Sequence, residues 1–88
     1  PKFVKALAGL GKTYTAMGRG AEAVATLEKA IKDYPRSGQL YLELARAYTV
    51  SGEYEKALDA YAKAAKFAMG NTLVREAETE ARKIRKFR

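Results

Sequence analysis

The sequence contains no cysteine and no histidine, and only two of its 88 residues are proline. Without cysteine the chain cannot form a disulfide framework or use a thiol nucleophile. Without cysteine and histidine it cannot build a zinc-finger-type site or supply a histidine base. The two serines, Ser37 and Ser51, both stand at expected helix borders. The sequence therefore predicts a protein that is not an enzyme and that needs neither a metal nor a cofactor.

Long apolar runs are also missing, since none approaches the roughly 18 residues that would suggest a membrane-spanning helix. Apolar residues make up 48% of the chain and charged residues 31%, which is typical of a soluble globular domain. At 88 residues the chain has room for one small domain and not for two. The sequence begins at Pro1 without methionine, which we interpret as a sign that it is a piece of a longer protein.

Acidic residues are the minority among the charged ones, with 10 Asp and Glu against 17 Lys and Arg, so the net charge is +7. The last seven residues contain no acid at all, and their cations could contact nucleic acid or an anionic membrane surface. Alternatively, these cations only stabilise the C-terminal end of a helix. We favour this second interpretation, because charge alone carries little specificity. The basic-tail residues are Arg82, Lys83, Arg85, Lys86 and Arg88.

Strand-like alternation of apolar and polar residues is absent, and the apolar residues recur at helical spacing instead. In residues 2–17, for example, Phe3, Leu7, Leu10, Tyr14 and Met17 follow one another at steps of 4, 3, 4 and 3. The same kind of spacing predicts five helices, over residues 2–17, 21–34, 37–50, 54–67 and 72–87.

Glycine and proline mark the breaks between these helices. Gly18 and Gly52 can adopt the left-handed conformation that closes a helix. Pro35 cannot continue a helix, and Ser37 can cap the one that follows. Because the connections are only three or four residues long, consecutive helices should be antiparallel neighbours.

The chain also repeats itself with a period of 34 residues. Leu10 matches Leu44 at this offset, and Tyr14 matches Tyr48. A fixed period of this length over a helix–turn–helix unit is typical of stacked helical repeats. Further identical pairs are Thr15 with Thr49, Gly18 with Gly52, Ala23 with Ala57, Lys29 with Lys63, Ala30 with Ala64 and Lys32 with Lys66.

This pattern resembles the tetratricopeptide repeat family. The first copy carries Leu7, Leu10, Gly11, Tyr14, Ala23, Leu27, Ala30 and Pro35 at the family's signature positions. The second carries Tyr41, Leu44, Ala45, Tyr48, Ala57, Tyr61 and Ala64, with Met69 where the family has proline. The resemblance implies an all-α fold, a right-handed superhelical solenoid of two helical hairpins plus a closing helix. It also implies one domain over residues 1–88, with repeats at about 4–37 and 38–71 and a capping helix at about 72–88.

Both ends of the array depart from the repeat. After residue 71 the signature fails, but Val74, Ala77, Ala81 and Ile84 form a narrow apolar stripe that suits a closing helix. At the other end, the face of Phe3 and Leu7 should be left uncovered. Because uncovered apolar patches drive association, we expect a weak homodimer.

Two patterns could suggest an enzyme, and we assign neither to catalysis. Residues 6–13, ALAGLGKT, match a relaxed phosphate-binding loop. That loop requires a preceding strand, and the repeat already accounts for its residues as packing positions. The paired carboxylates Glu53/Glu55 and Glu76/Glu80 are better explained as helix-start and surface charges.

The family resemblance implies a protein–protein interaction module that binds a peptide or helix of a partner in a concave groove. We expect an acidic or amphipathic segment as the partner, with Lys12 and Arg46 as charged contacts, partly neutralised by Glu43, and Leu42 as the apolar contact. Binding of nucleic acid or a membrane surface by the basic tail is the less favoured alternative. A chaperone-tail clamp is not expected, because Ala8, Lys12, Glu43, Leu73 and Ala77 stand at its positions. The groove candidates are Lys5, Ala8, Lys12, Thr15, Gln39, Leu42, Arg46 and Thr49.

Overall fold

The computed structural model describes residues 2–87, and these fold into five α-helices without a strand in that range. The helices are α1 (Lys2–Ala16), α2 (Gly20–Asp33), α3 (Gly38–Val50), α4 (Tyr54–Lys66) and α5 (Asn71–Phe87). Each end lies within one residue of the position predicted from the sequence. The all-α helical-repeat fold is therefore confirmed.

The turns inside the two hairpins have the same construction. Gly18 and Gly52 have φ angles of 77° and 78°, a left-handed conformation that a side chain would strain. The amide after each glycine closes the turn, with Arg19 N donating to the Tyr14 carbonyl and Glu53 N to the Tyr48 carbonyl, both at 2.9 Å. This six-residue closure is a Schellman motif. The 34-residue repeat therefore extends to the turn geometry.

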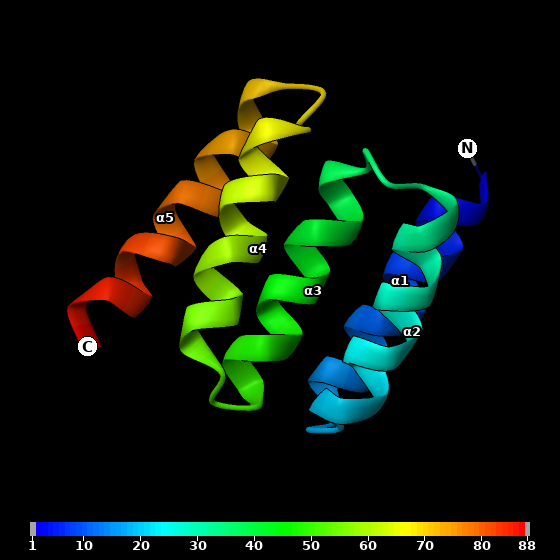
Figure 1. Ribbon diagram of the computed structural model, residues 1–88, viewed down its shortest axis with the longest axis horizontal. Helices are drawn as coiled ribbons and strands as arrows, with labels where there is room; N and C mark the ends of the chain where they lie inside the picture. Colours follow the sequence, from blue (N-terminus) through cyan, green and yellow to red (C-terminus); the bar gives the residue numbers. More distant parts are fainter. Residues whose placement is uncertain (1, 88) are drawn as a thin grey trace.

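The helices pack as stacked hairpins (Figure 1), in which each helix contacts the next along the chain. In addition, α1 packs on α3 and α3 packs on α5, whereas α2 and α4 do not pack closely on each other within the described residues. An opening of about 440 Å³ separates α2 from α4, and its floor includes Tyr41, Leu44 and Tyr48 of α3. The helices α1, α3 and α5 therefore share one face, and α2 and α4 lie apart on the other.

Small residues allow the helices to approach closely. A side chain at Gly11 would lie 2.5 Å from Leu27 of α2, and Ala45, at the matching position of the second copy, is fully buried. Close approach of this kind requires Gly or Ala at the contact, because larger side chains would hold the helices apart. The predicted stripe of the closing helix is buried at Ala77, Ala81 and Ile84.

The N cap of α3 follows the sequence prediction. Ser37 Oγ accepts a hydrogen bond from the Leu40 amide at 3.3 Å, which satisfies one of the free N–H groups at the helix start. No helix within residues 2–87 is both long and apolar enough to cross a membrane.

Candidate functional site

The face shared by α1, α3 and α5 carries the groove candidates. We call it the groove face and define it by Lys5, Lys12, Gln39, Arg46 and Glu80. Lys5, Lys12 and Gln39 are exposed there, and Arg46 is half-buried. The sequence prediction that Lys12 and Arg46 occupy equivalent positions on adjacent helices is consistent with this arrangement, because α1 and α3 are in direct contact.

Two of the predicted apolar contacts are not available to a partner. Ala8 and Leu42 are each only 2% exposed and belong to the hydrophobic core. Leu42 was expected to be the apolar contact in the groove. The prediction failed because α3 lies in the middle of the stack and packs against four helices. Neighbouring helices therefore bury Leu42, although its position on α3 is next to the exposed side of that helix.

The two groove threonines are bonded to their own helices. Thr15 Oγ1 donates to the Gly11 carbonyl at 2.9 Å, and Thr49 Oγ1 donates to the Ala45 carbonyl at 2.8 Å. Each hydroxyl can still accept a hydrogen bond. Their role on the groove face is therefore limited to that of acceptors.

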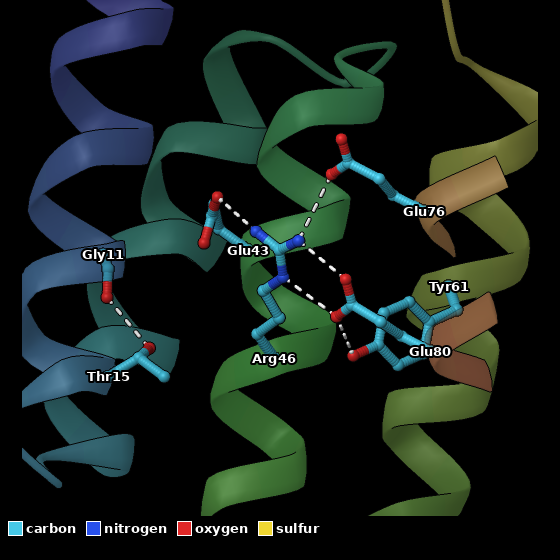
Figure 2. A network of polar contacts seen from close by, with 7 residues as sticks. All are labelled: Gly11, Thr15, Glu43, Arg46, Tyr61, Glu76 and Glu80. Carbon is cyan, nitrogen blue, oxygen red and sulfur yellow. Dashed lines mark hydrogen bonds and ion pairs between the residues drawn. The ribbon is translucent and has the colours of Figure 1, made fainter. Parts of the chain in front are cut away.

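Arg46 is the centre of a charged network that joins α3 to α5 (Figure 2). Its guanidinium binds Glu80 in a bidentate manner, with Nε at 2.9 Å from Oε1 and Nη2 at 2.7 Å from Oε2. It also reaches Glu43 at 3.1 Å and Glu76 at 3.3 Å. Paired hydrogen bonds of this type are the strong form of an ion pair.

The sequence prediction recognised only part of this network. The neutralisation of Arg46 by Glu43 is confirmed, but Glu76 and Glu80 were interpreted as surface charges and in fact bind Arg46. The signal for Glu80 was present, because it stands 34 residues after Arg46, the same offset that relates Lys12 to Arg46. Arg46 is therefore largely occupied within the chain.

Glu43 is a buried carboxylate, only 6% exposed. Its Oε2 accepts the bond from Arg46, while its Oε1 has no hydrogen-bond partner within the described residues. Burial raises the pKa of Glu43, and the nearby Arg46 and Lys12 partly counteract this. A buried carboxylate of this kind depends on its cation, because loss of the cation would leave a charge in the interior.

Glu80 has the opposite shift. Burial alone would raise the pKa of its carboxyl group, but the hydrogen bonds from Arg46 and from Tyr61, whose hydroxyl donates at 2.9 Å, outweigh burial and lower that pKa. The bond to Glu80 in turn raises the pKa of Arg46. Both groups are therefore charged at neutral pH.

The shift of Glu80 predicts a pH-dependent contribution to stability. A lowered carboxyl pKa stabilises the fold above the ordinary value of about 4.3, and this stabilisation is lost as the pH falls through the folded-state pKa. We expect Glu80→Gln to lower the free energy of unfolding by about 1 kcal/mol at neutral pH. In urea titrations the difference from wild type should shrink towards about pH 3. The exposed Glu78→Gln serves as the control, and a difference that does not change with pH would contradict the prediction.

The two lysines of α1 differ from Arg46. Within residues 2–87, neither Lys5 nor Lys12 forms an ion pair. Helix α1 also contains Lys2 and no acidic residue. On the α1 side of the groove face, the described lysines therefore form no ion pair and the charge is positive. On the α3–α5 side, Arg46 is bound by three carboxylates.

The remaining candidate motifs have plain structural roles. Residues 6–13 lie in the middle of α1, so no loop forms there to hold a phosphate. Glu53 pairs with Lys56 at 3.2 Å at the start of α4. The part of the chain that the structure describes contains no cluster of acidic residues suited to a metal ion. Arg82, Lys83, Arg85 and Lys86 are exposed on α5, and Arg88 lies outside the described residues.

Comparison with known proteins adds one finding to this geometry. A family model described as Tetratricopeptide repeat matches residues 9–72, which is more than half of the chain. The matched region extends from the middle of α1 to the start of α5. No curated protein matches the chain.

Proposed function

Because the chain belongs to the tetratricopeptide repeat family, whose repeats generally form non-catalytic modules for protein–protein interaction, we propose that its groove face binds an acidic segment of another protein. The observation that carries this proposal is that two lysines of α1, Lys5 and Lys12, form no ion pair within residues 2–87. Lys5 and Lys12 are seven residues apart, two turns along one side of the helix. Two carboxylates of a peptide that follows α1 could each reach one of them.

The role of Arg46 in this proposal differs from that of the lysines. Its guanidinium is bound by three carboxylates, so a partner would have to displace them to reach it. We therefore assign the charged contacts to Lys5 and Lys12, and Gln39 of α3 offers an amide beside Lys5. Arg46 keeps α3 and α5 in place beneath the partner.

The test begins with a partner captured from the source cell and then titrated as a purified protein. We expect the double variant Lys5→Ala, Lys12→Ala to bind it about tenfold more weakly, which corresponds to about 1.4 kcal/mol. Lys29→Ala is the matched control, because Lys29 is an exposed lysine on α2 and should leave the affinity unchanged.

The basic tail is tested in the same titration. Because Ile84 is buried, deletion of the last residues would also remove part of the core. We therefore replace Arg82, Lys83, Arg85 and Lys86 with glutamine. If this variant abolishes binding while the α1 double variant binds like wild type, the groove proposal is wrong and the tail is the site.

A further inference from the structure

A cavity opens beside the groove face at the end of the stack where α1 and α3 begin (Figure 1). Its volume is about 620 Å³ and its walls are mostly apolar, which is typical of sites that bind small ligands or single side chains. The lining comes from the start of α1, from residues 33–39 and from Met69 in the loop before α5. Because both copies of the repeat contribute, the cavity lies between stacked units and not on the outer side of α1.

The second copy shows what closes the equivalent space. At the 34-residue offset, Gly38 matches Val4 and Leu73 matches Gln39. Leu73 is partly buried against the core and packs tightly on the start of α3, since a side chain added at Gly38 would lie 2.9 Å from Leu73 Cδ2. Gln39, by contrast, is exposed at the edge of the cavity. An aliphatic side chain thus packs in the second copy where the first copy has an amide and an opening.

The charged residues of the lining favour an anion beside this opening. Lys5 and Arg36 are exposed and form no ion pair within residues 2–87. Asp33 is the one acid among the described lining residues, so the cations are in excess. Apolar walls with a positive rim are complementary to an apolar group that has a carboxylate beside it.

The cavity also supplies what the groove face otherwise lacks. Ala8 and Leu42, the expected apolar contacts, are buried in the core. Lys5 lines the cavity, and Lys12 lies two turns further along α1. The two lysines are therefore about 10 Å apart along the helix axis, a distance that three residues of extended chain cover. A segment that pairs with both lysines thus places its next residue at the cavity.

We propose that this cavity holds an apolar side chain of the acidic segment bound by the groove face, and so selects segments with a leucine-sized residue next to a carboxylate. That carboxylate pairs with Lys5, and a second one, three residues away, pairs with Lys12. The inference rests on the function proposed above and adds the feature by which the partner is recognised.

Synthetic peptides test this inference. Each contains two glutamates separated by two glycines, with either leucine or alanine outside one glutamate, and each is made in both chain directions. The chain has only two methionines, so ¹³C labelling of their methyl groups gives one reporter in the cavity, Met69, and one just after the other end of α1, Met17. In NMR titrations the leucine peptide, in one of its directions, should shift the Met69 signal and leave the Met17 signal unchanged. It should bind about tenfold more tightly than the alanine peptide, because leucine buries more apolar surface.

A variant that closes the cavity identifies the contact. Gln39→Leu places on α3 the side chain that Leu73 provides in the second copy, and it should abolish the preference for the leucine peptide. Thr79→Leu is the matched control, because it adds a leucine at an exposed position of α5 that does not line the cavity. This control should keep the tenfold preference.

The failure of this inference is distinguishable from that of the proposed function. Lys12→Ala should weaken both peptides about threefold and keep the leucine preference, since Lys12 does not line the cavity. If both lysines can be replaced by alanine without effect while the preference remains, the proposed function is wrong and the cavity still binds the apolar side chain. Equal affinities for leucine and alanine peptides in both directions would overturn the cavity and leave the lysine contacts standing.

Other results would also overturn the inference. These are a leucine preference that survives Gln39→Leu, and no shift of the Met69 signal at about 5 mM peptide. A Met69 signal that moves on dilution of the protein alone would assign the cavity to a second copy of the chain. Tighter binding of octanoate than of the leucine peptide would assign it to a fatty acid.

Discussion

Replacement of Tyr48 by alanine is expected to lower the free energy of unfolding by about 3–5 kcal/mol. The ring of Tyr48 is only 8% exposed and lies where α2, α3 and α4 converge, with the Lys56 ammonium 5.8 Å from its centroid. Loss of the ring leaves a cavity in this seam and removes the hydroxyl bond to Glu28. Because small domains have only about 5–15 kcal/mol of stability, the variant should be largely unfolded well below the melting temperature of wild type.

Two further variants separate the ring from the hydroxyl. Tyr48→Phe keeps the ring and should cost about 1–2 kcal/mol, because the lost hydrogen bond is to a carboxylate but is only partly buried. Tyr14→Ala is the matched control at the equivalent, half-buried position and should cost clearly less than Tyr48→Ala. Thermal unfolding followed by circular dichroism measures all three. Equal costs at positions 14 and 48 would show that burial by α2 does not stabilise the Tyr48 ring.

The second large effect is expected at Arg46, where alanine should destabilise the fold by about 2–4 kcal/mol. The change leaves Glu43 buried without its cation and also releases Glu80, which together with Arg46 connects α3 to α5. The expected loss of stability is smaller than for a fully buried ion pair, because the Arg46 side chain is 29% exposed. Urea denaturation at neutral pH is the measurement.

A rescue variant identifies the cause of this loss. Glu43→Gln in the Arg46→Ala background removes the buried charge and should recover about 1 kcal/mol or more. Lys12→Ala, an exposed cation on the same face, should change stability by less than about 0.5 kcal/mol. If Arg46→Ala is no more harmful than Lys12→Ala, the network contributes little to the fold. Arg46→Lys should be more stable than Arg46→Ala but less stable than wild type, since lysine keeps the charge but cannot form the bidentate bond with Glu80.

The helices could be predicted closely from the sequence, because their signals are local. Apolar spacing and the residues Gly18, Pro35 and Gly52 define where each helix begins and ends. The 34-residue period then related the two hairpins and brought Lys12 and Arg46 to equivalent positions.

The candidate site was harder to predict, because it depends on contacts between helices that periodicity does not specify. The spacing of Leu42 is consistent with an outward position, but the central helix α3 has neighbours on several sides, which bury this residue. The carboxylates of α5 were missed for a related reason: the repeat signature fails there, so the 34-residue offset from Arg46 to Glu80 was not followed. The apolar face of α1 was predicted in part, since Phe3 was expected to be uncovered and is 70% exposed, whereas Leu7, expected on the same face, is partly buried.

The lack of contact between α2 and α4 has a mechanical consequence. Because α2 and α4 do not pack on each other, a change in the distance between them is resisted only by the separate contacts of each helix with α3, and the opening between them leaves room for movement. The contact of α1 with α3 on the opposite side then acts as a pivot. We therefore expect the array to deform by bending of one hairpin against the other, so that a partner bound on the α1–α3 side can change the curvature of the stack.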